Sequence, residues 1–503
     1  MNEQKTTLVI CADVNSQIGI GHMMRCITLA DSWKKNGGRC LIFGKIEAAS
    51  LRDRLLANGY EFFEISSEPA SIVLRLKNLK ISNAWVILDG YHFGPELHDD
   101  LINLGLCVLC IDDGAKLSRY PAQVILAQDG DILSYHHKAP PSSLILSGPL
   151  YRLLRQGIVE KSKKKGVSSN NAVILVTFGG ADTKNFTLTL VKVLDKILNK
   201  DDYVIIVLGS VNKHRDSVVQ ALEKVAYEYE LLQDVEDMSE LYFRADLAIS
   251  SAGGTAWEIA AAGLPAVLIS VTDNQKPGAD FLARVGAAIR LDEPSEIYSK
   301  SFASQFKNLL SDKQKRVAMS EVGRNLCDRK GSQRVVNILD ALDQKRLKHH
   351  LFRVRKAVSS DMDQIYRIAT DPDVRANSFS PTPIIFDNHA HWYTARLESL
   401  NTAMFVLELE GIVVAVVRYD RIEKCADIDL AVHSAFRGNG LGSYILKETV
   451  SDALYYLDVS ILRAIVLEHN LASRHCFIKA GFTDNGYENI KNEQCALFTF
   501  EER

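Results

Sequence analysis

The feature that most constrains this chain is a regular alternation of short apolar runs with helical patterns, from residue 8 to about residue 340. Each run of Val, Ile and Leu is followed by a turn containing Gly or Asp, and then by a helical pattern. Strands that alternate with helices in this way predict parallel sheets covered by helices on both faces. The clearest predicted strands are Thr7–Cys11, Cys40–Phe43, Trp85–Leu88, Val108–Ile111, Val173–Phe178, Tyr203–Leu208, Leu247–Ser250 and Ala266–Ile269.

The pattern divides the chain into three parts. A polar, basic stretch over residues 160–171 interrupts the alternating region, and we interpret it as a solvated linker between two lobes. Near Phe352 the pattern becomes mixed and partly antiparallel, with Glu410-Gly411 as a hairpin turn between two apolar runs. We therefore predict an α/β protein with lobes over 1–158 and 172–345 and a third domain over 352–503. Its expected strands are Arg353–Ala357, Ala403–Glu408, Val413–Tyr419 and Asp427–Val432.

The charge balance argues against a nucleic-acid-binding or membrane-surface protein. The 503 residues carry 59 Lys and Arg against 62 Asp and Glu, a net charge of −3, and those partners usually require a basic face. The chain has no apolar run close to the roughly 18 residues of a membrane helix, and polar residues 1–7 lead directly into the first strand. The nine cysteines form no paired framework. We expect a cytoplasmic protein of undetermined oligomeric state that needs no metal.

A glycine turn with a histidine follows the first predicted strand. Gly19 and Gly21 precede His22 and Arg25, which open a helix. Glycines at such a point allow a ligand to approach the backbone closely, and the N–H groups of a helix start favour anions. His22 is therefore a candidate general base, and the alternative is a histidine that caps its own helix.

Three side chains that follow predicted strands are candidates to orient a sugar or the imidazole: Asp13, Asp89 and Tyr91. Ligand groups gather at the carboxyl ends of parallel strands. The alternative for each is that it only forms or caps a turn.

The second lobe contains further glycine turns at strand ends. One of them leads into a helix start, which is a physical site for a diphosphate, with Glu258 one turn into the helix. Each glycine pair alone is weak evidence, but the ordered set favours a nucleotide-sugar site. Its candidate residues are Gly19, Gly21 and Arg25 of the first lobe and Gly179, Gly180, Ser251, Gly253, Gly254, Thr255, Glu258, Asn274 and Gln275 of the second.

Residues 7–340 resemble the UDP-2,4-diacetamido-2,4,6-trideoxy-β-L-altropyranose hydrolases of pseudaminic acid biosynthesis. These are similar to glycosyltransferases with two Rossmann-like lobes, the GT-B-like architecture. The resemblance implies that His22 activates water against the anomeric carbon and that UDP leaves. Asp13 and Tyr91 are the further catalytic candidates. Cys11 is a departure, because the family often has Arg there. The matching segments are 19–25, 112–113, 148–151, 177–182, 251–258 and 273–275.

The third domain has its own glycine-rich turn. Residues 437–442 lead from a predicted strand into a helix expected from about Ser443 to Tyr455, so N–H groups point at a pyrophosphate. This domain resembles the α+β GNAT superfamily of N-acetyltransferases, which implies acetyl-CoA as co-substrate. The implied acetyl-CoA residues are Val432, Arg437, Gly438, Gly440, Leu441, Gly442, Asn470, Ser473 and Phe477.

Two positions bear on which residues could act as acid and base in acetyl transfer. Many members of the superfamily have Tyr as a candidate acid where Phe477 stands, and Phe cannot donate a proton. His433 is a possible base, but we interpret it as a histidine in a surface turn. The motifs at 371–378 and 389–392 look like the subgroup that acetylates UDP-4-amino-4,6-dideoxy-N-acetyl-β-L-altrosamine.

The resemblances together predict a bifunctional enzyme that acts on UDP-amino-sugars. The third domain would N-acetylate the 4-amino group, and the lobes would hydrolyse the diacetamido product to free sugar and UDP. The alternatives are a glycosyltransferase fused to an acetyltransferase, an acetyltransferase acting on a protein N-terminus, and a non-catalytic sensor of UDP-sugars. The sequence leaves the sugar stereochemistry and any passage of intermediate between sites open.

Overall fold

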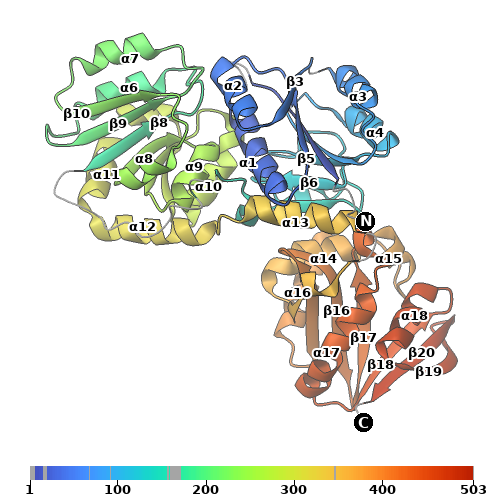
Figure 1. Cartoon of the computed structure of the whole chain (residues 1–503). Helices are drawn as coiled ribbons and strands as arrows, with labels where there is room; N and C mark the ends of the chain where they lie inside the picture. The colour runs from blue at the N-terminus through green and yellow to red at the C-terminus, as the bar shows by residue number, and fades with distance from the viewer. Residues whose placement is uncertain are drawn as a thin grey trace. The chain divides into compact units, whose positions relative to one another are not determined.

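The computed structural model of the chain describes residues 6–14, 20–66, 68–90, 92–155, 158, 172–344 and 347–501 (Figure 1). The chain forms two compact units. The first comprises Met1–Asp131 and Ile145–Val336, and the second comprises Ile132–Leu144 and Asn337–Arg503. The second unit therefore includes a short segment that the sequence places inside the first lobe. The boundary near residue 336 falls within helix α13 (Gly331–Asp343).

The first lobe is built on a seven-stranded sheet with the order β3-β2-β1-β4-β5-β6-β7. Strand β1 pairs in parallel with β2 and β4, so successive strands connect through helices, as the alternating sequence predicts. The strands are β1 (Thr7–Ala12), β2 (Cys40–Gly44), β3 (Glu61–Glu64), β4 (Ala84–Asp89), β5 (Cys107–Ile111), β6 (Val124–Ala127) and β7 (Leu144–Ser147). The helices are α1 (Gly21–Lys35), α2 (Ala49–Ala57), α3 (Pro69–Asn78), α4 (Pro95–Asn103) and η2 (Pro149–Tyr151).

The second lobe has a six-stranded parallel sheet with the order β10-β9-β8-β11-β12-β13. The strands are β8 (Val173–Thr177), β9 (Tyr203–Leu208), β10 (Glu228–Gln233), β11 (Leu247–Ser251), β12 (Ala266–Ile269) and β13 (Ala288–Leu291). The helices are α6 (Phe186–Leu194), α7 (Arg215–Leu222), α8 (Ser239–Arg244), α9 (Gly254–Ala261), η3 (Asp273–Gln275), α10 (Lys276–Arg284), η4 (Pro294–Tyr298), α11 (Lys300–Ser311), α12 (Lys313–Leu326) and α13.

Both faces of the second-lobe sheet are buried. Leu175 and Ile205 belong to one apolar cluster, whereas their neighbours Ile174 and Ile206 belong to another. Side chains alternate across a strand, so two separate clusters mean that the sheet lies between two layers of helices. This explains why the strands have continuous apolar sequences.

The second unit contains a mixed seven-stranded sheet with the order β14-β15-β16-β17-β18-β20-β19, in which only β17 and β18 pair in parallel. Glu410 and Gly411 both have positive φ and form the predicted hairpin turn. The strands are β14 (Arg353–Lys356), β15 (Thr402–Leu409), β16 (Ile412–Ile422), β17 (Cys425–Val432), β18 (Ile461–Leu467), β19 (Thr483–Ile490) and β20 (Glu493–Glu501). The helices are η1 (Leu133–Tyr135), η5 (His349–Leu351), η6 (Ser359–Asp361), α14 (Met362–Ala369), α15 (Pro372–Ala376), α16 (Phe386–Glu398), η7 (Ser434–Phe436), α17 (Leu441–Leu457) and α18 (Leu471–Ala480).

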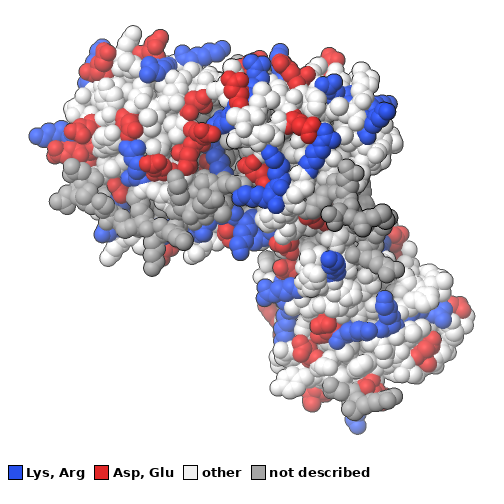
Figure 2. Space-filling model, in the orientation of Figure 1, with Lys and Arg blue, Asp and Glu red and all other residues white. Residues whose placement is uncertain are grey.

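These sheets confirm the predicted fold class of two Rossmann-like lobes followed by a mixed α+β domain. On the face shown in Figure 2, the described Lys and Arg side chains are interspersed with Asp and Glu. Among the described helices, none is both long and apolar enough to cross a bilayer.

Candidate active sites

The first unit contains a cleft of about 630 Å³ lined by residues of both lobes. Most residues predicted for the nucleotide-sugar site line it, although they come from several separate turns. Those residues are Gly21, His22, Arg25, Gly179, Gly180, Ser251, Gly253, Gly254, Thr255, Glu258, Asn274 and Gln275. Gly19 and Tyr91, which were also predicted, lie outside the described residues.

His22 and Arg25 lie one turn apart on α1 and share one carboxylate. Nδ1 of His22 lies 2.5 Å from Oδ1 of Asp89, the last residue of β4. Arg25 donates to both oxygens of Asp89, from Nε at 2.6 Å and from Nη2 at 2.7 Å. His22 and Asp89 are 67 positions apart in the sequence. They meet because β1, which precedes α1, and β4, which ends at Asp89, are neighbouring parallel strands.

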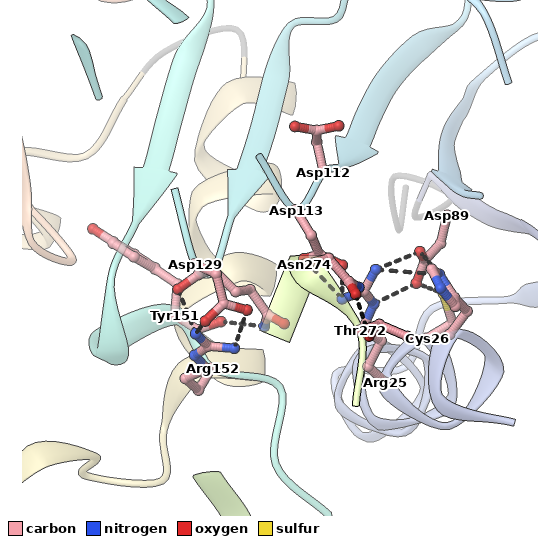
Figure 3. Close-up of polar contacts among 12 residues, drawn as sticks. Arg25, Cys26, Asp89, Asp112, Asp113, Asp129, Tyr151, Arg152, Thr272 and Asn274 are labelled. Atoms are coloured by element: carbon pink, nitrogen blue, oxygen red, sulfur yellow. Dashed lines mark hydrogen bonds and ion pairs between the residues drawn. The ribbon is translucent and has the colours of Figure 1, made fainter. Parts of the chain in front are cut away.

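Arg25 also binds a second carboxylate. Its Nη1 donates to both oxygens of Asp113, at 3.0 and 2.9 Å. Figure 3 shows Asp89 and Asp113 on two sides of the Arg25 guanidinium, at the ends of neighbouring strands β4 and β5. Both carboxylates thus hold Arg25 beside the histidine.

The electrostatics keep Asp89 ionised. Burial alone would raise its pKa, but the Arg25 guanidinium and the His22 imidazole hold the pKa of this carboxyl well below its usual range. Asp89 is fully buried on its side chain, whereas His22 keeps some exposure towards the cleft. A fixed anion at Nδ1 orients the imidazole.

Asp13 makes different contacts. Its Oδ1 accepts from the backbone N–H of Lys45 at 2.7 Å, and its Oδ2 lies 3.2 Å from Nε2 of His92. The first contact joins the end of β1 to the end of β2. These contacts place Asp13 at a junction of loops.

The glycine turns of the second lobe make close backbone contacts. A Cβ on Gly209 would lie 2.2 Å from the carbonyl oxygen of Gly180, so the loops after β8 and β9 can touch only without a side chain there. Helix α9 begins at Gly254 with Gly253 as N-cap and no side-chain cap. Its first N–H groups therefore lie at the cleft without a capping side chain from Gly253, as expected for an anion site.

Glu258 is buried and lines the cleft. Its Oε2 accepts from the Tyr242 hydroxyl at 2.9 Å, and its Oε1 lies 3.2 Å from Nε of Arg155. Sequence reasoning missed Arg155 and Tyr242, and it also missed Arg152, which forms an ion pair with Asp129 and stacks on Trp257 at 3.7 Å. Arg152 directly follows the matched segment 148–151 and Arg155 lies four residues beyond it, and this proximity is the signal that marks both arginines.

The second unit forms the predicted glycine-rich loop. Gly438 and Gly440 have φ of +79° and +76°, and Gly440 is the N-cap of α17 without a side-chain cap. A Cβ on Gly442 would lie 2.8 Å from Sγ of Cys476 on α18. The N–H groups of the loop therefore lie at a helix start. Gly438 and Gly440 are required by their positive φ, and Gly442 is required by the lack of space for a side chain.

The other predicted acetyl-CoA residues make structural contacts around that loop. Val432 accepts at its carbonyl from Nε of Arg437 at 3.1 Å, and Leu441 is buried in the first turn of α17. The side chain of Asn470 caps α18 by accepting from the backbone N–H of Ser473 at 3.1 Å. Phe477 is buried against Phe482 and Phe498.

The interpretation of His433 as a surface histidine is wrong. Its side chain is buried, and Nδ1 accepts from the backbone N–H of Ala435 at 3.3 Å. Burial, aided by the neighbouring Arg367 and Arg437, lowers its pKa to about 3. The turn was predicted correctly, but the helices packed over it were not visible in the local sequence.

Two protein families match separate parts of the chain. Residues 173–335 match the glycosyltransferase family 28 C-terminal domain, and residues 352–483 match the acetyltransferase (GNAT) domain. These ranges correspond to the second lobe and to most of the mixed sheet domain.

The relatives match one part of the chain or the other. The spore coat polysaccharide biosynthesis protein SpsG of Bacillus subtilis is 27% identical over 67% of this chain and 99% of its own length. MurG of Acinetobacter baumannii is 18% identical with a TM-score of 0.48, covering 67% of this chain and 99% of that one. Spermidine N-acetyltransferase from Vibrio cholerae, in complex with CoA and spermine, is 15% identical with a TM-score of 0.28, covering 30% and 96%. The chain is thus similar to glycosyltransferase family 28 proteins over its second lobe and to GNAT acetyltransferases over its mixed-sheet domain.

Proposed function

We propose that this protein is a bifunctional nucleotide-sugar enzyme. The GNAT domain transfers an acetyl group from acetyl-CoA to the 4-amino group of a UDP-linked 6-deoxy-amino-sugar. The cleft of the two lobes then hydrolyses the UDP-diacetamido-trideoxy-altrose to free sugar and UDP, a step of pseudaminic acid biosynthesis. The observation that carries the hydrolase assignment is the pairing of His22, which lines the glycine-rich cleft, with the buried Asp89.

The hydrolytic step needs a base and a site for the leaving diphosphate. His22 removes a proton from water as the water oxygen bonds to the anomeric carbon, and the bond from that carbon to the diphosphate oxygen breaks. UDP is a good leaving group, so the N–H groups at the start of α9 suffice to stabilise its charge. Gly179, Gly180, Ser251 and Thr255 surround the same part of the cleft.

The acetyl transfer step uses the loop of the second unit. The acceptor amine attacks the thioester carbonyl, a C–N bond forms, the C–S bond breaks, and the amine loses a proton. Acetyl-CoA fits the loop because its pyrophosphate can lie against the N–H groups of residues 438–442. Gly440 and Gly442 have no side chain that would block this approach. Because Phe477 cannot donate a proton, the thiolate of CoA must take its proton from another group or from water.

One experiment tests both steps. The purified protein is incubated with acetyl-CoA and a UDP-4-amino-6-deoxy sugar, and the products are identified by mass spectrometry. The proposal expects an acetylated UDP-sugar that is converted to free sugar and UDP. Acetylated UDP-sugar that persists with wild-type protein, without UDP release, would remove the hydrolase assignment.

A second candidate is sugar transfer to an organic acceptor instead of water. The match of the second lobe to a glycosyltransferase family favours it. The same incubation distinguishes the two, because a glycosyltransferase would release UDP only after an acceptor is added.

A further inference from the structure

Arg437, the arginine of the glycine-rich loop, is held by two hydrogen bonds and by one further ion pair. Its Nη2 lies 2.9 Å from Oδ2 of Asp371, its Nη1 lies 2.7 Å from Oδ2 of Asp373, and its Nε donates to the carbonyl of Val432. The guanidinium therefore points at two carboxylates on the turn that enters α15. A phosphate would have to compete with both of them.

Asp371 is the carboxylate that makes this arrangement hard to break. It is 5% exposed, and its other oxygen accepts from the backbone N–H of Asp373 at 2.9 Å as the N-cap of α15. Withdrawing the guanidinium would leave a buried carboxylate without its cation, which is costly. The arrangement thus favours an Arg437 that stays with the carboxylates when a ligand binds.

Lys479 offers a second cation beside the same loop. It is exposed on α18, and its Nζ lies 3.5 Å from the point that a Cβ on Gly440 would occupy. Helix α18 also places Cys476 against Gly442, so it packs on the first turn of α17. The ammonium consequently lies next to the N–H groups that start α17.

We propose that Lys479 supplies the positive charge that pairs with the pyrophosphate of acetyl-CoA, and that Arg437 is a positioning residue. Arg437, held by Asp371 and Asp373, fixes the loop so that its N–H groups face the cofactor. A lysine ammonium is a compact point charge on a flexible chain and can reach a phosphate without leaving a partner behind. The proposal rests on the acetyl-CoA site proposed above.

Calorimetric titration of acetyl-CoA into the full-length protein tests the separate roles of Lys479 and Arg437. The titration is done at about 50 mM and about 500 mM salt, because the higher concentration screens exposed ion pairs. Lys479→Met should raise Kd about tenfold at low salt and far less at high salt, equivalent to one lost charge-assisted contact. Lys424→Met is the matched control, because this exposed lysine lies at the opposite end of β17 and should leave Kd unchanged.

The positioning role is tested by a double-mutant cycle in the same titrations. Asp371→Asn keeps the capping oxygen of α15 and removes only the charge. Asp371→Asn and Arg437→Met should each raise Kd by a similar factor at both salt concentrations, and the double variant should be no weaker than either single variant. If the two substitutions only destabilised the fold, they would lower the melting temperature by similar amounts. Their effects on Kd would then not show the non-additivity expected above.

Three results decide the matter. Tighter binding in Asp371→Asn, with a weaker salt dependence in Arg437→Met, would make Arg437 the phosphate ligand. Unchanged affinity in Lys479→Met would remove Lys479 from the site. If the wild-type protein bound no acetyl-CoA, the proposed acetyltransferase function itself would fail, which is a different result from either of these.

Discussion

At the residue scale, the feature that positions His22 is a carboxylate that its imidazole shares with a guanidinium. Asp89 accepts from His22 and from Arg25, and Arg25 is held in turn by Asp113. Removing the charge of Asp89 while keeping its shape would leave the imidazole in place without the anion at its Nδ1. A neutral amide at position 89 therefore tests whether His22 needs that anion.

Asp89→Asn should lower UDP release from a diacetylated UDP-sugar by about 100-fold or more, the range expected for loss of general-base catalysis. Steady-state assays of UDP release would measure this. Asp99→Asn, an exposed carboxylate on α4 in the same lobe, serves as the control and should keep the wild-type rate. A rate near that of wild type in Asp89→Asn would mean that the histidine works without its carboxylate.

Two buried histidines of the second unit predict a dependence of stability on pH. Burial lowers the pKa of His389 to about 4 and that of His433 to about 3, against 6.5 for an ordinary histidine. The folded state therefore binds fewer protons than the unfolded state below pH 6.5, so stability is present near neutral pH and is lost as pH falls. Each histidine should cost about 2 kcal/mol by pH 5.

Thermal unfolding of the full chain between pH 7.5 and about pH 5 would measure this loss. His389→Leu removes one titrating group from a site lined by Tyr366, Trp392 and Tyr393. The variant should show a shallower fall in the melting temperature of the second unit between the two pH values. An identical slope in the variant and the wild type would exclude His389 as a source of the acid sensitivity.

At the scale of the elements, the acetyl-CoA loop depends on a left-handed residue at the start of α17. Gly440→Ala should destabilise the second unit by about 1–2 kcal/mol, because an L side chain is strained at a φ of +76°. It should also weaken acetyl-CoA binding, since the N–H groups of this turn would move. Titration calorimetry and thermal unfolding measure the two effects separately.

Gly486→Ala is the control for this prediction. Gly486 lies in β19 with a φ of +86°, and no atom lies within 4 Å of the point that a Cβ would occupy there. The variant should lose similar stability and keep its affinity for acetyl-CoA. Equal losses of affinity in both variants would show that the effect is general destabilisation of the unit.

Two edge strands are among the elements that the sequence pattern failed to predict, together with the internal strands β6, β18 and β20. β3 (Glu61–Glu64) and β10 (Glu228–Gln233) each form the outer edge of a sheet and begin with glutamate. An edge strand has one neighbour and partly exposed faces, so it needs no continuous apolar run. Central strands such as β1 and β8 are buried on both faces, and their positions were predicted to within one residue at each end.

At the scale of the whole molecule, the two proposed activities lie on different parts of the chain and should be separable by single substitutions. His22→Ala should reduce UDP release by more than about 100-fold and leave acetyl transfer near the wild-type rate. Mass spectrometry of the reaction should then show the acetylated UDP-sugar accumulating. Loss of both activities from this one change would contradict two independent sites.

The sequence by itself determined the order of the elements, the glycine turns and the division into unlike folds. These properties depend on periodicity and on backbone conformations that neighbouring residues dictate, such as the turn at Glu410-Gly411. It also indicated which residues line the cleft, because the carboxyl ends of parallel strands meet at one edge.

Only the tertiary structure decided the partners and the burial of individual side chains. Four findings involve residues that are distant in sequence. They are the pairing of His22 with Asp89, the ion pair of Arg437 with Asp371, the burial of His433 and the inclusion of Ile132–Leu144 in the second unit. Such contacts depend on how sheets and helices pack. The local sequence pattern around a residue does not indicate which distant element will cover that residue. The motifs therefore suggest the chemistry of the sites, but the packing sets it by bringing Asp89 to His22 and Asp371 to Arg437.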